Sequence, residues 1–198
     1  MKQSLLILVS GPAGSGKTTL CEHLTKEFTP RVKQVVTATT RRPRNGERDG
    51  IEYIFLNREE FEAKIEAGEF YEHAKVHAHS YGTLKTEIEE SLSSGNDLLL
   101  NIDVQGAAAY RSAAKNDPVL ADRLVSVFVR LRNLSQAKER LMERGNDSSS
   151  EIAFRLQTAE IELQEWPHFD HSFISGSKEE DYKRFRNIYL NEKARILG

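Results

Sequence analysis

The feature that most constrains this chain is a glycine-rich segment near its start, between an apolar run and a helical pattern. Residues 5–9 form a short continuous apolar run, typical of a buried strand, and residues 19–24 have helical spacing. The segment between them fills every fixed position of the pattern G-x-x-x-x-G-K-[ST] with Gly11, Pro12, Ala13, Gly14, Ser15, Gly16, Lys17 and Thr18. A strand, a glycine-rich turn and a helix in this order predict a phosphate-binding P-loop.

The chemistry of a P-loop gives each of its parts a task. Glycines let the backbone wrap a polyphosphate closely, and the N–H groups and helix N-terminus supply partial positive charge. Lys17 adds a positive charge for the β- and γ-phosphates, and the Thr18 hydroxyl is placed to hold Mg²⁺. We therefore expect residues 11–18, with the adjoining Thr19, to bind a nucleoside triphosphate together with Mg²⁺.

Composition and charge limit the other partners of the chain. Its 198 residues suit a single domain with a sizeable core, and its net charge of −2 gives no global field that favours nucleic acid or a membrane. The N-terminal apolar run is too short for a signal sequence or a membrane span. Cys21, on a predicted packed helix, is expected to be a core residue in a reducing compartment. We expect a cytoplasmic protein, a monomer or weak homo-oligomer, with no nucleic-acid or membrane partner.

Apolar runs alternate with helical patterns along most of the chain. Strands are predicted at residues 4–10, 97–102, 125–131 and 172–175. Helices are predicted at residues 16–27, 84–93, 104–115, 134–143, 150–165 and 178–196. This alternation predicts an α/β fold, a P-loop core in which a mostly parallel sheet lies between helices.

Residues 37–83 interrupt this alternation. Turn signals and strand-like runs predict strands at 52–56, 69–76 and 79–82, with a short helix at 58–67. Arg41 and Arg44 flank a proline in an extended segment, and their guanidinium groups match phosphate oxygens in pairs. Tyr53 and Tyr81 can donate hydroxyls to the same phosphate. These arginines alone also fit a solvated basic turn or a nucleic-acid patch, but a small β-rich insertion here suits a second substrate.

Several motifs, in one order along the chain, resemble those of guanylate kinases. They are residues 37–47 (TATTRRPRNGE), 50–53 (GIEY), 72–74 (EHA), 81–83 (YGT), 102–107 (IDVQGA), and Arg144-Gly145 followed by residues 148–151 and Arg155. The resemblance runs from about residue 5 to residue 175. It implies one domain over residues 1–198, with a core (1–36, 84–142 and 156–198), a GMP-binding insertion (37–83) and a short lid that closes over ATP (143–155).

The resemblance implies transfer of the γ-phosphoryl group of ATP to GMP, giving ADP and GDP in purine nucleotide metabolism. It assigns four residues to the GMP phosphate, namely Arg41, Arg44, Tyr53 and Tyr81. It assigns four to the guanine end, namely Thr37, Glu72, Thr83 and Asp103. The chemistry agrees for Glu72, because one carboxylate accepts from both N1–H and N2–H₂ of guanine, whereas adenine presents an unprotonated N1. The Thr37 and Thr83 hydroxyls can donate to guanine O6.

The transfer step asks for electrostatic stabilisation more than for acid–base chemistry. The phosphate of a nucleoside monophosphate is mostly dianionic at pH 7, so we expect no dedicated general base. Charge on the transferring group is expected to be stabilised by preorganised cations. The residues assigned to this task are Lys17, Arg41, Arg144 and Arg155.

The chain departs from the family pattern at two places. Asn101 stands where the family usually has aspartate in the core strand, so help from this position in holding Mg²⁺ should be weaker. Ser175-Gly176 replaces an Asn-Asp pair that touches adenine, so that contact is not carried over. No residue is assigned to the ribose 2′-hydroxyl, which leaves the use of dGMP open.

Other functions fit parts of the pattern. A related P-loop kinase for another phosphorylated small molecule, such as a ribose bisphosphate, has no reason to keep Glu72 with Thr37 and Thr83. A guanylate-kinase-like interaction module typically loses P-loop residues, which are intact here. His73, His77 and His79 lie close in sequence, but no cysteine or carboxylate spacing completes a zinc ligand set.

Overall fold

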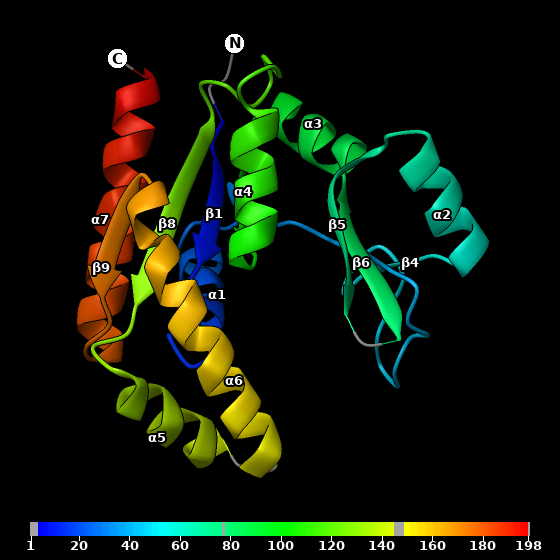
Figure 1. Ribbon diagram of the computed structural model, residues 1–198. Helices are drawn as coiled ribbons and strands as arrows, with labels where there is room; N and C mark the ends of the chain where they lie inside the picture. The colour runs from blue at the N-terminus through cyan, green and yellow to red at the C-terminus, as the bar shows by residue number, and fades with distance from the viewer. Residues whose placement is uncertain (1–3, 77, 145–148, 198) are drawn as a thin grey trace.

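Two sheets of different size organise the protein, whose computed structural model describes residues 4–76, 78–144 and 149–197 (Figure 1). The larger sheet has five strands in the order β2-β7-β1-β8-β9, and every neighbouring pair is parallel. Its strands are β1 (Leu6–Ser10), β2 (Val32–Gln34), β7 (Asp97–Asn101), β8 (Leu124–Arg130) and β9 (His171–Ile174). The predicted α/β fold with a parallel sheet is confirmed.

Helices cover both faces of this sheet, which explains the continuous apolar run of β1. Ile7 and Val9 pack in one buried cluster with residues of α1 (Lys17–Glu27) and α7 (Lys178–Leu197). Leu6 and Leu8 point to the other face and pack in a second cluster with residues of α3 (Lys85–Ser93) and α4 (Val104–Ala113). A strand buried on both faces has no polar alternation to show in its sequence.

The smaller sheet has four strands in the order β4-β3-β6-β5 and stands to one side of the main sheet (Figure 1). Its strands are β3 (Ala38–Thr39), β4 (Ile54–Phe55), β5 (Phe70–Val76) and β6 (His79–Leu84). Its helix, α2 (Arg58–Glu66), begins with a capping box between Asn57 and Glu60. Ala38, Phe61, Phe70 and Leu84 form a small buried cluster of their own in this part of the molecule.

Helices α5 (Leu134–Arg144) and α6 (Ser149–Glu162) pack as a pair beside the main sheet, below it in Figure 1. The helix predicted at 150–165 ends earlier than expected, because residues Leu163–His168 form a 3₁₀ segment that contains Pro167. The predicted strand at 52–56 is reduced to Ile54–Phe55, and β2 and β3 were not predicted. No helix in the described ranges is long and apolar enough to cross a membrane.

Candidate active site

The glycine-rich loop lies at the carboxyl end of β1, where ligands of open parallel sheets bind. Gly11 has φ +138°, and a Cβ at this position would lie 2.3 Å from the Val129 carbonyl oxygen, so only glycine fits. Gly16 begins α1 in the left-handed region, with no side-chain cap and no acidic residue in the first turn. The helix N-terminus is therefore presented to the loop with its positive partial charge unopposed.

Lys17 and Thr18, the first two residues of α1, place a cation and a hydroxyl at the end of this loop. The Lys17 ammonium group donates to the carbonyl oxygens of Gly11 and, at 3.0 Å, Pro12. The exposed Thr18 Oγ1 accepts from Asn101 Nδ2 at 3.2 Å, because β7 ends beside β1. A threonine hydroxyl and an amide oxygen are hard ligands, and Mg²⁺ usually takes only one or two protein ligands beside phosphates and water. The residues present therefore fit Mg²⁺.

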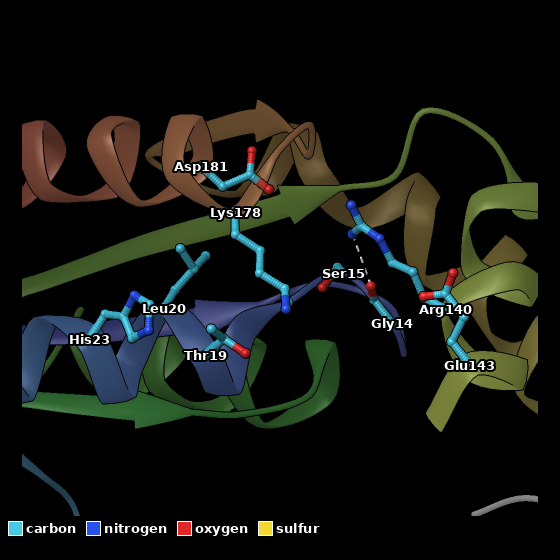
Figure 2. Close-up of a pocket in the computed structure, with 10 residues that line it drawn as sticks. Gly14, Ser15, Thr19, Leu20, His23, Arg140, Glu143, Lys178 and Asp181 are labelled. Carbon is cyan, nitrogen blue, oxygen red and sulfur yellow. Dashed lines mark hydrogen bonds between the residues drawn. The ribbon is translucent and has the colours of Figure 1, made fainter. Parts of the chain in front are cut away.

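A cavity of about 380 Å³ opens on the α7 side of the P-loop (Figure 2). Lys178, the first residue of α7, extends into it toward Ser15 and Thr19. Arg140 on α5 donates to the Gly14 carbonyl oxygen at 3.1 Å, as the dashed line in Figure 2 marks. The same guanidinium group donates to Ser175 Oγ and the Gly176 carbonyl oxygen, at 2.8 and 3.0 Å.

Asp181 holds the other side of this β9–α7 corner. It is buried, and its carboxylate accepts from Ser175 Oγ at 2.6 Å and from the Gly176 amide at 2.8 Å. Ser175-Gly176, where the family pattern is absent, is therefore fixed between two charged side chains that sequence reasoning missed. The sequence did hold a sign of Arg140, because it lies four residues before Arg144 and therefore on the same face of the predicted helix.

A second cavity, of about 330 Å³, lies between the P-loop and α6. It brings together Lys17 and Arg155, two of the four residues assigned to the transferring group, with Asp103, which was assigned to the guanine end, and it adds Glu162. Burial raises the pKa of Glu162, the Lys17 charge opposes the shift, and Asp103 adds to it. Arg144 is the last residue of α5, but its side chain and residues 145–148 lie outside the described residues, so the structure gives no contact for them.

Three of the four residues assigned to guanine form a row at the smaller sheet, and the fourth, Asp103, comes from the core. Glu72 on β5 pairs with Thr83 on β6, and Thr37 comes directly before Ala38, which pairs with Gly82. Thr83 Oγ1 donates to Glu72 Oε1 at 2.8 Å. The Thr83 hydroxyl hydrogen therefore points at the Glu72 carboxylate and not toward the site of the guanine ring. Thr83 thus fixes the position of the Glu72 carboxylate.

Glu72 is half-buried, and its surroundings bear on its charge. Burial raises the pKa of Glu72, Asp103 adds to the rise, and the Thr83 hydroxyl opposes it. Asp103 begins α4 and accepts from the Gly106 amide at 2.8 Å, so one of its oxygens serves as a helix cap. Both carboxylates line a cavity of about 400 Å³ between β5 and α4. The guanine end of the site therefore has two carboxylates, one of them fixed by a hydroxyl.

The residues assigned to the GMP phosphate gather around Arg41. Its guanidinium group lies 5.3 Å from the Tyr53 ring centroid, and the Tyr53 and Tyr81 rings are 6.1 Å apart. Glu47, which sequence reasoning missed, accepts from Nη1 and Nη2 of Arg41, both at 2.9 Å. Glu47 also accepts from the Arg44 amide at 2.7 Å, whereas the Arg44 side chain is exposed.

The pairing with Glu47 leaves part of the Arg41 fork available. Nη1 uses its second hydrogen on the Arg42 carbonyl oxygen at 2.8 Å. A guanidinium group has five N–H donors, and these bonds engage three of them. The hydrogen bonds with Glu47 raise the pKa of Arg41, and a hydrogen bond with the Tyr81 phenol adds to the rise, so Tyr81 lies at the same group. The edge formed by Nε and Nη2, which does not face Glu47 and Arg42 together, suits phosphate oxygens.

Comparison with known proteins tests the family. A model of the family described as guanylate kinase matches residues 3–192. The chain belongs to the guanylate kinase family. It is 36% identical to a guanylate kinase of Campylobacter jejuni strain RM1221, over 99% of this chain and 93% of that protein. It is 37% identical to a guanylate kinase of Clostridioides difficile strain 630, over 99% of this chain and 92% of the relative.

A solved structure supports the same family. The crystal structure of guanylate kinase from Anaplasma phagocytophilum superposes with a TM-score of 0.69 and 26% identity, over 98% of this chain and 88% of the other. ATP:GMP phosphotransfer is the known activity of the guanylate kinase family, a family of nucleoside monophosphate kinases. The family predicted from the motifs is confirmed.

Proposed function

We propose that the chain transfers the γ-phosphoryl group of ATP to GMP, with the two nucleotides held by the two parts of the structure. Residues 11–19 bind the ATP phosphates, and the cavity of Figure 2 takes the adenosine end. The acceptor GMP lies on the smaller sheet, with its phosphate at Arg41, Arg44, Tyr53 and Tyr81. Its base lies at Thr37, Glu72, Thr83 and Asp103.

The observation that carries this proposal is the Glu72–Thr83 pair. A half-buried carboxylate fixed by a buried hydroxyl presents two acceptor oxygens in a set direction. Guanine carries two adjacent donors, N1–H and N2–H₂, that match this edge, and adenine has an acceptor at N1. A buried polar site left unpaired rejects the wrong ligand strongly. Glu72 thus supplies the base specificity of the acceptor site.

The transfer centre lies between the P-loop and α6. Lys17 and Arg155 line the same cavity, and Arg144 ends the neighbouring helix. These cations stabilise charge on the transferring group, while Arg41 orients the GMP phosphate that attacks it. Thr18, with Asn101 beside it, would hold Mg²⁺. When bound with ATP, Mg²⁺ neutralises charge on the β- and γ-phosphates.

The division into parts follows from these roles. Residues 37–83 form the GMP-binding insertion, residues 143–155 the lid, and the rest the core of one domain. Both substrates must meet with water excluded, so the insertion and the lid are expected to approach the core when both nucleotides bind. A cytoplasmic monomer or weak homo-oligomer, acting on small nucleotides in purine metabolism, fits the near-neutral net charge.

Glu72→Gln tests the proposal. The amide keeps one acceptor but turns an NH₂ toward the guanine donors, which removes one hydrogen bond and the charge from the other. At ~1.5–3 kcal/mol for each hydrogen bond to a charged group, GMP should lose roughly 3–5 kcal/mol of transition-state binding. The ratio of kcat/KM for GMP over AMP should fall by about two to four orders of magnitude.

The matched control is Glu66→Gln, an exposed glutamate at the end of α2 in the same insertion. This variant should keep the wild-type kcat/KM for GMP and for AMP. If Glu72→Gln kept the discrimination of the wild type, Glu72 would not be the guanine reader. A kinase for another phosphorylated small molecule would then be the better interpretation.

A further inference from the structure

The hydroxyl of Tyr110 is a buried group that none of the roles above uses. Tyr110 lies on α4, is fully buried, and packs in the cluster that covers one face of the main sheet. Among the described residues, its hydroxyl has no hydrogen-bond partner. A buried donor without a partner lowers stability, and phenylalanine would fill almost the same space without that cost. Packing therefore explains the ring but not the hydroxyl.

The position of Tyr110 connects it with the guanine end of the site. Asp103, Gly106 and Tyr110 are spaced to share one face of α4, and the first two line the cavity that contains Glu72. Helix α4 packs on β5, and the Tyr110 ring lies 5.3 Å from that of Tyr71, the residue before Glu72. Tyr110 thus packs against β5, the strand that carries the Glu72 carboxylate.

The Thr83 hydroxyl and the Glu72 carboxylate both act on the Tyr110 phenol. Burial raises the pKa of the Tyr110 phenol, the Thr83 hydroxyl opposes this shift, and the Glu72 charge adds to it. Thr83 is itself fully buried, and its hydrogen is used on Glu72. Its oxygen can still accept a hydrogen bond, and the phenol is a donor. The two groups are thus complementary, although no hydrogen bond of acceptable geometry joins them in the structure.

We propose that Tyr110 is a positioning residue for guanine recognition, whose hydroxyl donates to Thr83 Oγ1 when GMP engages Glu72. The chain from Tyr110 through Thr83 to Glu72 then ends on a carboxylate, and each hydrogen bond in it strengthens the next. A hydrogen bond gained only in the complex adds to GMP affinity and not to the stability of the free protein. The proposal rests on the role of Glu72 proposed above.

Tyr110→Phe removes the hydroxyl and keeps the ring. GMP binding, measured by calorimetry without ATP, should weaken by about 3- to 10-fold, the effect of one neutral hydrogen bond. KM for GMP should rise in proportion, while KM for ATP stays unchanged. The melting temperature should stay the same or rise, because an unpaired buried donor has been removed.

Tyr71→Phe is the matched control and should give the opposite pattern. The Tyr71 hydroxyl has partners outside the base site, accepted by Asp117 at 2.9 Å and Glu89 at 3.3 Å. Its removal should lower the melting temperature and leave GMP binding unchanged. A residue that acts only through packing cannot produce this crossed result, in which one hydroxyl affects binding and its neighbour affects stability.

Two outcomes would overturn the proposal. One is GMP binding by Tyr110→Phe within twofold of the wild type, and the other is a lowered melting temperature, which would mean that the hydroxyl already has a structural partner. Glu72→Gln, measured alongside, distinguishes a failure of the role of Tyr110 from a failure of the proposed function. If it loses GMP discrimination while Tyr110→Phe has no effect, only the role of Tyr110 fails; if it keeps discrimination, the proposed function fails.

Discussion

The P-loop and the smaller sheet, the two nucleotide sites proposed above, offer different kinds of binding group. In the P-loop the backbone of one contiguous segment supplies the cradle, to which the Lys17 and Thr18 side chains are added, and Gly11 fits only because it lacks a side chain. On the smaller sheet the proposed binding groups are side chains from β5, from β6 and from the segments just before and after β3. A backbone cradle recognises any polyphosphate, whereas side chains on neighbouring strands can distinguish one base from another.

The two regions also differ in how firmly they are held. The P-loop continues β1, whose residues are buried on both faces between helices. The smaller sheet depends on the cluster of Ala38, Phe61, Phe70 and Leu84 and on polar pairs such as Arg41–Glu47. Fewer buried contacts mean a lower cost for local motion, which suits the part that has to close on its substrate.

Lys17→Ala should give the largest effect, and on the P-loop side alone. Removing a preorganised cation from a transferring phosphoryl group costs about 10²-fold or more in kcat. GMP binding by calorimetry should stay near wild type, because the proposed GMP site lies on the smaller sheet. Lys26→Ala, an exposed lysine of the same helix, is the control and should retain activity. Near-normal turnover of Lys17→Ala would refute the P-loop assignment.

This contrast explains what could be predicted from the sequence. The P-loop is contiguous, its glycines are required by the backbone, and residues 6–9 of β1 are all apolar. Its structure could therefore be predicted from one short segment of sequence. The other strands of the core sheet and its helices were predicted from their apolar runs and helical spacing. The short strands β2 and β3 were missed because each has two or three residues, and no periodicity can be counted over so short a run.

The parts of the site that were missed depend on distant pairings. Arg140 meets Ser175 only because α5 and β9 end at the same corner, and Asp181 completes that corner from α7. In the sequence Glu47 is one of several charged residues in a polar turn, and only the folded turn brings its carboxylate to Arg41. The motifs identified the residues assigned to the substrates. Only the tertiary structure identified the residues, such as Glu47, that fix the positions of those side chains.

Arg41→Lys tests whether side-chain geometry, and not charge alone, defines the acceptor site. Lysine keeps the charge but cannot pair with Glu47 through one edge and with phosphate through another. KM for GMP should rise about tenfold, the loss of one hydrogen bond to a charged group, while KM for ATP changes little. Arg42→Lys, an exposed neighbour, is the control. An equal effect on both substrates would place Arg41 at the ATP site instead.

Asn101→Asp should have the smallest effect and would show how far the P-loop depends on side chains. Asn101 now donates to Thr18 Oγ1 at 3.2 Å, whereas an aspartate would accept from the hydroxyl and add a negative charge beside it. Because a charge near an exposed ion contributes about 1 kcal/mol, the Mg²⁺ concentration for half-maximal activity should fall about fivefold. Binding of an ATP analogue, compared with and without Mg²⁺, gives a readout that is independent of turnover.

Asn187→Asp adds the same charge on the exposed side of α7 and separates a local effect from one of net charge. An unchanged Mg²⁺ requirement in Asn101→Asp would mean that position 101 takes no part in holding the metal, and that Thr18 and the phosphates suffice.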